Sequence, residues 1–564
     1  MHTSHTSAFM NLRICSLIIF LLFPLFSDSS NLIAQDNGWL KRYGSSETNN
    51  FSSSLLTPAG DVILTGYFTG GEGRMLLGNV ELVSHAPKEK SCGFIAKVNR
   101  SGETVWAQTL QSTFGGVLHT ATLDTKGNIY VMGNFIGELT YGSQKYVSFP
   151  NTPQSFLAKY DPEGRPLWVW MAPASIYFNA FNAVAADPLN NIYFAYNESQ
   201  TIYSDRLGYN LKLAKLDVNG NLLSDQLIAE SVHSIGCTSI KFNTQLQPVL
   251  LGSYKDKIVI GSQEHASPNT FNMFLLKSTT NGIPLWSIDI GKNAHTLSGS
   301  SELALDDANN IYVAGSFSDS PAKVTVLKKF NLNGRLIWQY TLDRELVPYL
   351  GGLAGTSLKI TSSHHIILTG FFSGDVSFGS TRFKTQFPEY TDLFVTKITK
   401  DGQVAGAIRS DAKGAVNPMS ILINNMGDFY VSGSFVSDNF VFQNSTSKQS
   451  GNFYDIFLLK GSLAALETNE IPEEIEENNS PALIIPNIIT PNGDGKNDAF
   501  VINTLQQDTE NLILIYNRWG KLVYQSKSYQ NDWSAAGLPN GSYFYVLQHL
   551  KTNRQYKGWV EVMR

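Results

Sequence analysis

Oxygen-bearing side chains crowd one short stretch near the C-terminus of this 564-residue sequence. Asn492, Asp494, Asn497 and Asp498 carry carboxylate and amide oxygens, which are the ligands that Ca²⁺ prefers. An EF-hand loop needs a glutamate at its twelfth position, and counting from Asn492 that position is Asn503. The same side chains also suit a turn in which they accept hydrogen bonds from backbone N–H groups. The sequence therefore leaves a calcium loop and a side-chain-capped turn as alternatives.

Histidines and short catalytic motifs give no constellation of reactive groups. Three histidines precede the glycine of their repeat by 14, 19 and 20 residues, so they share no register and are not expected to converge on a metal: His119, His233 and His295. No Gly-x-Ser-x-Gly elbow, His-Glu-x-x-His pair or phosphate-cradling loop occurs. We expect no catalytic residues from these motifs.

The elements that position such side chains are predicted by a repeated sequence motif, which we call the first phrase. In it a turn is followed by an alternating apolar strand, a small residue and an aromatic. Seven copies occur over a mean period of about 61 residues, longer than common propeller repeats, so we assign the surplus to loop: Gly60–Phe68, Gly127–Phe135, Asn190–Asn197, Gln247–Tyr254, Asn309–Phe317, His364–Phe372 and Gly427–Phe435.

A second phrase follows the first six copies: a strand ending in lysine, a turn with glycine five residues later, and a strand that usually carries tryptophan. Two strands around a short glycine loop predict a β-hairpin, and with the run before the first phrase each repeat has about four strands, the content of one propeller blade. The lysines are Lys97, Lys159, Lys215, Lys277, Lys329 and Lys397, and the tryptophans are Trp106, Trp168, Trp286 and Trp338.

The turn of the second phrase also carries a polar side chain two residues after the lysine. Only two of these six side chains are carboxylates, so we interpret them as turn-forming residues and not as a repeated metal site: Asn99, Asp161, Asp217, Thr279, Asn331 and Thr399. Asp161 lies three residues before Gly164, which departs from the spacing of both quinoprotein Trp-docking repeats and sialidase Asp-boxes.

The ends of the repeat region predict how it closes. Phe457–Lys460 supplies a third strand to the last repeat without a tryptophan strand after it, whereas Trp39–Tyr43 stands alone before the first repeat. We expect Trp39–Tyr43 to complete the last blade, because pairing the chain ends leaves no open sheet edge. Residues 35–462 are thus predicted to form an all-β, seven-bladed propeller closed by its N-terminal strand.

Composition and the N-terminus indicate the class of protein. Hydrophobic residues make up 42% and aromatic residues 12%, and 42 Lys+Arg against 47 Asp+Glu give a net charge of −5, which suits a globular β protein without a nucleic-acid partner. Arg13 precedes the apolar run Ile14–Phe26, so residues 1–34 are predicted to be a secretory signal peptide. No later run is long enough to cross a membrane. Cys92 and Cys237 are predicted to be buried thiols.

After the repeats, residues 463–482 are predicted to be an acidic linker, with six glutamates between Glu467 and Glu477. Residues 483–564 contain short strands separated by Gly, Asn and Pro turns, which indicates a small C-terminal β-sandwich.

The motifs of this last segment resemble the gliding-motility-associated C-terminal domain, the type B sorting domain of the type IX secretion system. They are Pro486–Asp498, Ile515–Gly520, Leu538–Tyr545, Lys557–Gly558 and the terminal arginine. The stretch Trp533–Gly537 departs from the family, which usually has an acidic residue or Asn and a Gly directly after the tryptophan. Residues 39 to 460 also resemble SBBP β-propeller repeats.

The resemblance implies the type IX secretion machinery as a partner and a secreted or outer-membrane surface location. We predict a binding or adhesion module with an unknown extracellular glycan or protein ligand, no required cofactor and no enzymatic activity; the alternative is a polysaccharide hydrolase or lyase on a propeller scaffold. The resemblance places the sorting motif at Pro486, Asn487, Thr490, Pro491, Asn492, Gly493, Asp494, Gly495, Asn497, Asp498, Tyr516, Asn517, Arg518, Trp519, Gly520, Pro539, Gly541, Tyr543, Gly558 and Arg564.

Overall fold

The computed structural model describes residues 38–466 and 485–564 apart from short internal gaps, the longest of which are 293–300, 344–353 and 503–510. The predicted signal peptide (1–34), His295 and Asn503 lie outside the described residues. The described residues form β-strands and one short 3-10 helix, η1 (Leu463–Leu466). The chain divides into two compact units, Met1–Asn469 and Glu470–Arg564, and it is all-β as predicted.

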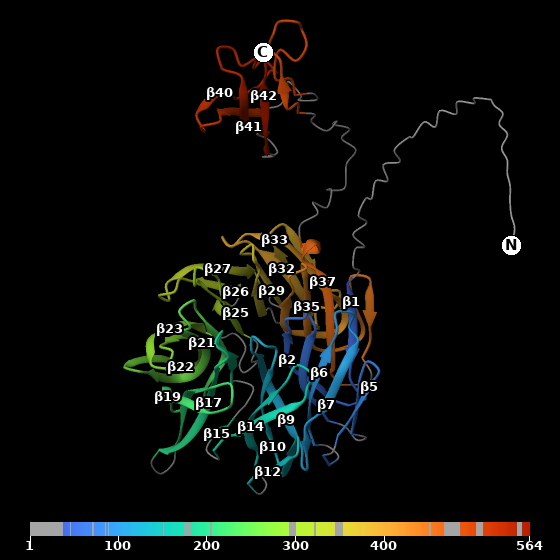
Figure 1. Ribbon diagram of the computed structural model, residues 1–564, viewed down its shortest axis with the longest axis vertical. Helices are drawn as coiled ribbons and strands as arrows, with labels where there is room; N and C mark the ends of the chain where they lie inside the picture. The colour runs from blue at the N-terminus through green and yellow to red at the C-terminus, as the bar shows by residue number, and fades with distance from the viewer. Residues whose placement is uncertain are drawn as a thin grey trace, which may run out of the picture. The chain divides into compact units, whose positions relative to one another are not determined.

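Between Trp39 and Ser462 the strands pair into seven antiparallel four-stranded units, some of which join into larger sheets. Six units are meanders in sequence order, and in the seventh the outer strand is the N-terminal β1 (Trp39–Tyr43). This arrangement is propeller-like (Figure 1). The first three units are β2 (Asn49–Leu56), β3 (Val62–Phe68), β6 (Cys92–Val98) and β7 (Thr104–Thr109); β9 (Gly116–Leu123), β10 (Ile129–Phe135), β13 (Gln154–Tyr160) and β14 (Pro166–Met171); and β16 (Val184–Ala186), β17 (Ile192–Ile202), β18 (Arg206–Leu216) and β19 (Leu222–Ser231).

The remaining units have the same pattern. They are β20 (Ile235–Phe242), β21 (Pro248–Ile260), β22 (Gln263–Ser278) and β23 (Pro284–Lys292); β24 (Glu302–Leu305), β25 (Ile311–Ser320), β26 (Lys323–Phe330) and β27 (Leu336–Asp343); β28 (Ala354–Ile360), β29 (Ile366–Phe372), β32 (Asp392–Ile398) and β33 (Val404–Arg409); and β34 (Asp411–Ile423), β35 (Asp428–Phe442), β37 (Asp455–Ser462) and β1 (Trp39–Tyr43).

The surplus length of the repeat is largely strand, and not the loop that the sequence predicts. Between the second and third strands the chain adds a hairpin or lengthens the two strands, as in β21 and β22, which stay paired to Ile260↔Gln263. Backbone pairing satisfies the N–H and C=O groups of such an extension, which an irregular loop would leave to water. The strands added there are β4 (Arg74–Leu77), β5 (Val80–Val83), β11 (Glu138–Tyr141), β12 (Gln144–Val147), β30 (Asp375–Phe378), β31 (Thr381–Lys384) and β36 (Ser445–Ser447). Two further short strands, β8 (Gln111–Ser112) and β15 (Ile176–Tyr177), lie between units.

The N-terminal strand pairs with the last repeat in the predicted place. β1 runs antiparallel to β37 over five residue pairs, from Trp39↔Lys460 to Tyr43↔Ile456, and the two strands lie side by side in Figure 1. Tyr43 is fully buried. This pairing brings together segments that are more than 400 residues apart in the sequence.

The glycine of the first phrase lies opposite a β-bulge in the first strand of its unit. In β2 the register shifts between Phe51 and Ser53, where this strand passes Gly66. A Cβ at Gly66 would collide with the Asn50 carbonyl oxygen, so the two strands can approach this closely only where one has no side chain. The same collision with a first-strand carbonyl would occur at Gly133, Gly252, Gly370 and Gly433.

We therefore expect Gly370→Ala to lower the free energy of unfolding by about 2–3 kcal/mol, because overpacking forces the backbone of β28 to shift. The matched control is Gly315→Ala. There the nearest atoms to a new Cβ are the Phe317 ring at 3.0 Å and the Met273 sulfur at 3.8 Å, and side chains can move aside at about 1 kcal/mol or less. Urea unfolding of both variants measures the difference, and equal losses would contradict the explanation.

The tryptophans of the second phrase pack between units. Trp168 lies on Gly220 of the next unit, and its indole Nε1 donates to the Val218 carbonyl at 3.2 Å. The repeat lysine Lys159 donates to the same carbonyl at 2.9 Å. These contacts make the lysine and tryptophan structural residues that join neighbouring units. Equivalent indole contacts are Trp338 on Gly402 with the Lys400 carbonyl, and Trp39 on Gly102 with the Arg100 carbonyl.

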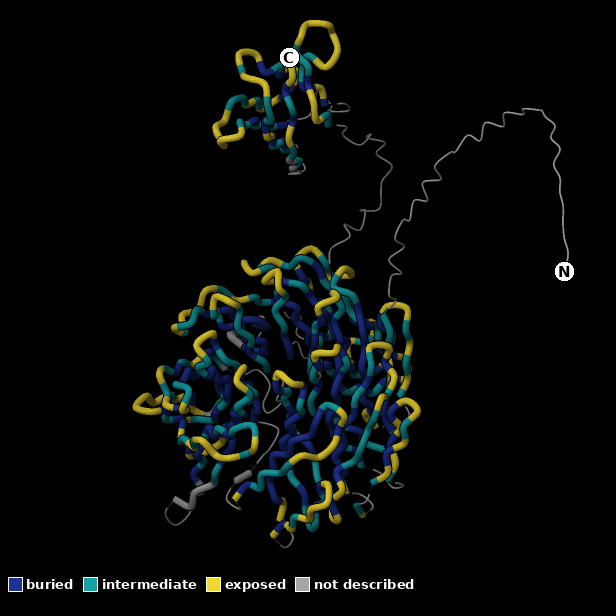
Figure 2. The backbone as a smooth tube through the Cα atoms, in the orientation of Figure 1, coloured by how far each residue is buried: buried dark blue, intermediate teal, exposed yellow. Residues whose placement is uncertain are grey.

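The turn residues and cysteines are structural, as predicted. Asp161 Oδ1 accepts the backbone N–H groups of Glu163 and Arg165 at 3.0 and 2.8 Å. Cys92 and Cys237 are buried thiols, and burial raises the pKa of Cys237 to about 12. Figure 2 shows the buried strands inside each unit and the exposed turns at their ends.

The first residues of the predicted linker 463–482 belong instead to the folded repeat region. η1 covers Leu463–Leu466, and Leu466 is fully buried among the apolar side chains of the last two units. A buried leucine explains why the chain stays folded here, since its apolar area leaves water. The acidic residues from Glu467 to Glu477 lie outside the described residues.

The C-terminal unit is a single five-stranded sheet in its described residues, with the order β38-β42-β41-β39-β40. A sandwich of two sheets therefore stays a prediction. One face carries a core that includes Phe500, Tyr529 and Trp533. The strands are β38 (Ile488–Ile489), β39 (Asn511–Asn517), β40 (Leu522–Ser526), β41 (Gly541–His549) and β42 (Gln555–Val562).

Candidate functional site

A cavity of about 400 Å³ lies among the first strands of the seven units in the repeat region. Every unit contributes lining residues from its first strand or from the residues next to it, and the residues are Ser52–Leu56, His119–Ala121 and Leu123, Asn182–Val184, Thr238–Lys241, Ser301–Glu302, Thr356, Ser357 and Lys359, and Met419, Ser420, Leu422 and Ile423. The seven first strands therefore share one space.

Two equivalent positions of each repeat form rings of side chains around this cavity. The hydroxyl ring lies thirteen residues before the glycine of the first phrase, or before Tyr196 in the third copy, where tyrosine replaces that glycine. It consists of Ser53, Thr120, Ala183, Ser239, Glu302, Ser357 and Ser420. The bulge ring lies one residue earlier, and it consists of Ser52, His119, Asn182, Thr238, Ser301, Thr356 and Met419. Most members carry a hydroxyl, so the wall offers many neutral donors and acceptors.

β-Bulges aim five of the seven members of the bulge ring, whereas Asn182 and Ser301 precede the first strands of their units. The register shift at Cys237 and Ser239 leaves Thr238 without a paired residue on the neighbouring strand, and the shift at Gly355 and Ser357 does the same for Thr356. A bulge re-aims the side chain of the extra residue. The repeat glycine, which permits the bulge, thus also determines which residues reach the cavity.

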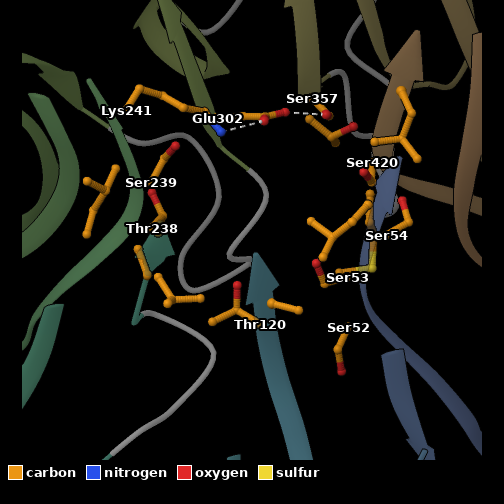
Figure 3. A pocket seen from close by; sticks show the side chains of 18 of the residues that line it. Ser52, Ser53, Ser54, Thr120, Thr238, Ser239, Lys241, Glu302, Ser357 and Ser420 are labelled. Atoms are coloured by element: carbon orange, nitrogen blue, oxygen red, sulfur yellow. Dashed lines mark hydrogen bonds and ion pairs between the residues drawn. The ribbon is translucent and has the colours of Figure 1, made fainter. Parts of the chain in front are cut away.

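Glu302 is the single carboxylate among the described residues that line the cavity. Its Oε1 lies 2.7 Å from Lys359 Nζ and 3.5 Å from Lys241 Nζ, and its Oε2 accepts hydrogen bonds from the Ser357 hydroxyl and the Leu358 backbone N–H. Figure 3 shows Lys241 and Ser357 meeting at Glu302. Burial alone would raise the pKa of Glu302, but the two ammonium groups outweigh it and lower the pKa to about 2.

His119 is the imidazole at the cavity wall. Its Nε2 lies 2.9 Å from Asn134 Nδ2, and burial lowers the pKa of His119 to about 4. At neutral pH the cavity therefore holds an ionised Glu302 and a neutral His119.

Sequence reasoning missed Glu302, Lys241 and Lys359, although a signal was present. The two lysines each lie eleven residues before the repeat glycine of their own unit, Gly252 and Gly370. Aligning the first strands by their distance from that glycine would have shown both rings and the lone carboxylate. His119 belongs to the bulge ring, and His233 lies outside the cavity lining, with Nε2 3.4 Å from Asp256.

The structure places the predicted sorting-motif residues in two groups. Pro486 to Asp498 surround the edge strand β38. Tyr516 and Asn517 end β39, and Arg518–Gly520 lie in the turn that leads to β40 at the opposite edge. Gly558 pairs with Tyr545 within the sheet. The guanidinium of Arg564 donates to the carbonyls of Ala535 and Leu538, each at 2.6 Å.

Residues from two separated motifs meet in a pocket of about 90 Å³, where Asn517, Arg518 and Trp519 face Pro539, Gly541 and Tyr543. Asn517 Oδ1 accepts the backbone N–H groups of Trp519 and Lys521, so this stretch is a side-chain-capped turn. Trp519 is 84% exposed. The turn therefore also presents an exposed aromatic side chain.

The loop at Asn492–Asp498 shows the contacts of a side-chain-capped turn. Asp498 Oδ1 accepts the backbone N–H groups of Asn492 and Gly493 at 2.9 and 2.8 Å, and Oδ2 accepts that of Gly495 at 2.7 Å. These backbone bonds lower the pKa of Asp498. Asp494 Oδ1 accepts the Lys496 N–H at 2.8 Å.

We expect calcium to leave this loop unaffected, because both oxygens of Asp498 already accept backbone N–H groups. Adding millimolar CaCl₂ should not raise the unfolding midpoint of the C-terminal unit in calorimetry of the full chain, whereas a bound ion would stabilise the folded state. Asp498→Ala should lower that midpoint with or without calcium. A calcium-dependent rise that Asp498→Ala abolishes would contradict the capped-turn interpretation.

The C-terminal unit matches a family of secretion signals. Residues 483–562 match the CHU_C type IX secretion signal domain. This part of the chain is therefore a type IX secretion signal, which implies export to the cell surface or extracellular space and contact with the type IX machinery. None of the helical structure in the described residues has the length and apolar character of a membrane span.

Comparison of the whole chain gives distant similarities. A WD repeat-containing protein of Acanthamoeba polyphaga mimivirus is 24% identical over 63% of this chain, and the match spans about a third (32%) of that protein. PorZ, a surface component of the type IX secretion system of Porphyromonas gingivalis, is 10% identical over 92% of this chain and 82% of its own, with a TM-score of 0.24. An ulvan lyase is 11% identical over 72% of this chain and 97% of its own, with a TM-score of 0.39.

Proposed function

We propose that the type IX secretion signal at residues 483–562 delivers a seven-bladed β-propeller to the cell surface or beyond it, where the propeller binds an extracellular ligand without chemical turnover. The resemblance of residues 39 to 460 to SBBP repeats belongs to the same proposal. The observation that carries it is the cavity at which the first strands of seven units meet.

Three contacts support a closed ring of seven blades. β1 pairs with β37, Trp39 makes the same indole-to-carbonyl bond to the next unit as Trp168 and Trp338, and one apolar cluster joins the first and last units. That cluster includes Tyr43, Phe51, Val62, Phe94, Tyr430, Ile456 and Leu458. A ring closed in this way leaves fewer open sheet edges.

The groups in the cavity favour binding over glycosidic hydrolysis. Glycosidic hydrolysis needs one carboxyl group that is protonated and a second that is ionised, whereas Glu302 is the one carboxylate among the described lining residues and has a pKa of about 2. The hydroxyl ring instead offers donors and acceptors at fixed positions. Such a set suits a polar ligand with many hydroxyl groups.

The test is a glycan and protein array probed with the purified mature chain, residues 35–564. We expect retention of a defined subset of carbohydrates, with no new reducing or unsaturated chain ends after prolonged incubation of the bound glycans. Cleavage of a retained glycan would instead establish the hydrolase or lyase alternative.

A further inference from the structure

One position of the hydroxyl ring departs from the rest. Five of its seven members are serine or threonine, but the fifth unit places Glu302 there. The two units that flank the fifth in sequence supply the lysines: Lys241 comes from β20 and Lys359 from β28. The charges thus occupy one side of an otherwise neutral ring, around a single carboxylate.

These charges do not balance. Two lysines share one carboxylate, and His119 is neutral at pH 7. Burial lowers the pKa of Lys359, and the carboxylate of Glu302 at 2.7 Å opposes that shift. With both lysines protonated, the described lining residues carry a surplus of one positive charge. A charge inside a cavity with low-dielectric walls acts more strongly on a ligand than the same charge on an open surface. The surplus favours a ligand with a negative group.

The two lysines are held differently. Lys359 Nζ lies 2.7 Å from Glu302 Oε1 and also donates to the Leu358 carbonyl at 3.1 Å. Lys241 Nζ lies 3.5 Å from Glu302, and its side chain is 42% exposed. Lys241 is therefore the lysine that can turn toward a ligand, while Lys359 and Ser357 hold Glu302 in place.

We propose that this cavity binds the carboxylate of an acidic saccharide through Lys241, while the hydroxyl ring binds the sugar hydroxyls. The inference rests on the proposed binding function and names its ligand class. A volume of about 400 Å³ falls within the usual range for small-molecule sites. Ser239 and Thr238 lie on the same strand as Lys241, and Figure 3 shows their hydroxyls with that of Thr120 around the same space.

The side chains of the lining bear on which kind of anion the cavity can bind. The bidentate fork of arginine, which suits phosphate and carboxylate groups alike, is absent from the described lining residues, and lysine offers a point charge instead. A sulfated sugar is therefore distinguished from a uronate by experiment. A nucleotide would also need an aromatic side chain on which to stack its base, and the described lining has no Phe, Tyr or Trp. A carboxylate on a polyhydroxyl ring matches both the point charge and the hydroxyls.

The test is calorimetric titration of the mature chain at constant ionic strength. The probes are glucuronate and an oligoglucuronate, with glucose and glucose 6-sulfate as matched neutral and sulfated sugars. We expect binding of a uronate at least tenfold tighter than that of either control. Monomer and oligomer of equal affinity would identify a single sugar residue as the ligand, and preference for the oligomer would identify a chain.

Three substitutions make the assignment specific. Lys241→Gln should weaken uronate binding at least tenfold, whereas Glu302→Gln should strengthen it several-fold, because it removes the competing carboxylate. The control is Lys257→Gln, a lysine outside the cavity lining that pairs with Glu264 at 2.7 Å, and it should leave binding unchanged. Circular dichroism verifies that each variant is folded.

The outcomes separate this inference from the proposed function. Equal binding of glucose and glucuronate, preference for the sulfated sugar, or no effect of Lys241→Gln would overturn the uronate assignment. If the array then still yields a ligand, the binding function stands without this site. If neither the array nor the titration detects a ligand, both proposals fail.

Discussion

Trp39→Ala should lower the free energy of unfolding of the repeat region by about 3 kcal/mol, the usual cost of truncating a packed tryptophan. Trp39 lies in β1, which is the outer strand of the last unit. Its indole packs on Gly102 of the first unit, so it joins the last unit to the first. Its loss would weaken the contact that closes the ring, so its effect should be large for a residue near a chain end.

The physical reason is that Trp39 makes the same contacts as Trp168 and Trp338 inside the repeat region. It lies 3.1 Å from the position that a Cβ on Gly102 would take, and its indole Nε1 donates to the Arg100 carbonyl at 3.2 Å. Its ring also lies edge-on to Tyr430, with centroids 6.1 Å apart. The neighbouring Tyr43 donates its hydroxyl to the Gly102 carbonyl.

The control is Trp168→Ala, which removes the equivalent contact between the second and third units. If the ring is closed, urea unfolding followed by circular dichroism should give losses for the two variants that agree within about 1 kcal/mol, the scale on which context changes such values. A loss at Trp39 far below that at Trp168 would show that β1 is an appendage and that the ring is open.

The comparison between sequence and structure is most informative at the repeat glycines. Their recurrence predicted a strand with a small residue at this position. The reason that the residue must be small lies in the neighbouring strand, where a bulge brings a carbonyl against Gly66, Gly252 or Gly370. Bulges follow from strand pairing at a distance. Local sequence therefore indicates that another group approaches the glycine closely. Only the pairing of the strands shows that this group is a backbone carbonyl of the first strand.

The third unit shows how the fold tolerates a departure from its own pattern. Ser224 replaces the tryptophan there, and the hydroxyl of Tyr193 donates instead to the Thr280 carbonyl of the next unit at 2.9 Å. The contact between units is thus of the same kind, although a different strand supplies the donor. A sequence pattern based on tryptophan alone misses this substitution.

The cavity was less predictable than the fold, for a physical reason. Most members of its rings are serine and threonine, which are common on any strand, and a single serine such as Ser53 carries no signal of function. The site emerges only when equivalent positions of all seven first strands are brought around one space. The terminal signal domain was predictable from residues alone because each of its motifs is a short contiguous run of residues.

Deletion of residues 483–564 should abolish appearance of the protein at the cell surface and leave it in the periplasm. The secretion signal domain lies within the deleted segment. The repeat region has its own apolar clusters, which share no residue with the core of the C-terminal unit. The repeat region should therefore stay folded, and the truncated chain would lose only its secretion signal.

Protease accessibility on intact cells, compared with a periplasmic fraction, measures both locations. Surface display of the truncated chain at the full-length level would refute this role.

A matched pair of tryptophans separates recognition from folding within that segment. Trp519 is 84% exposed and Trp533 only 4%, so Trp519→Ala should leave the core intact whereas Trp533→Ala opens a cavity beside Phe500 and Tyr543. Exposed tryptophans that a partner covers often carry much of the binding energy. If the secretion machinery contacts the turn at Asn517–Gly520, Trp519→Ala should reduce surface display at least tenfold without changing the unfolding midpoint. Unchanged display would show that this turn serves the sheet alone and that the machinery contacts another part of the domain.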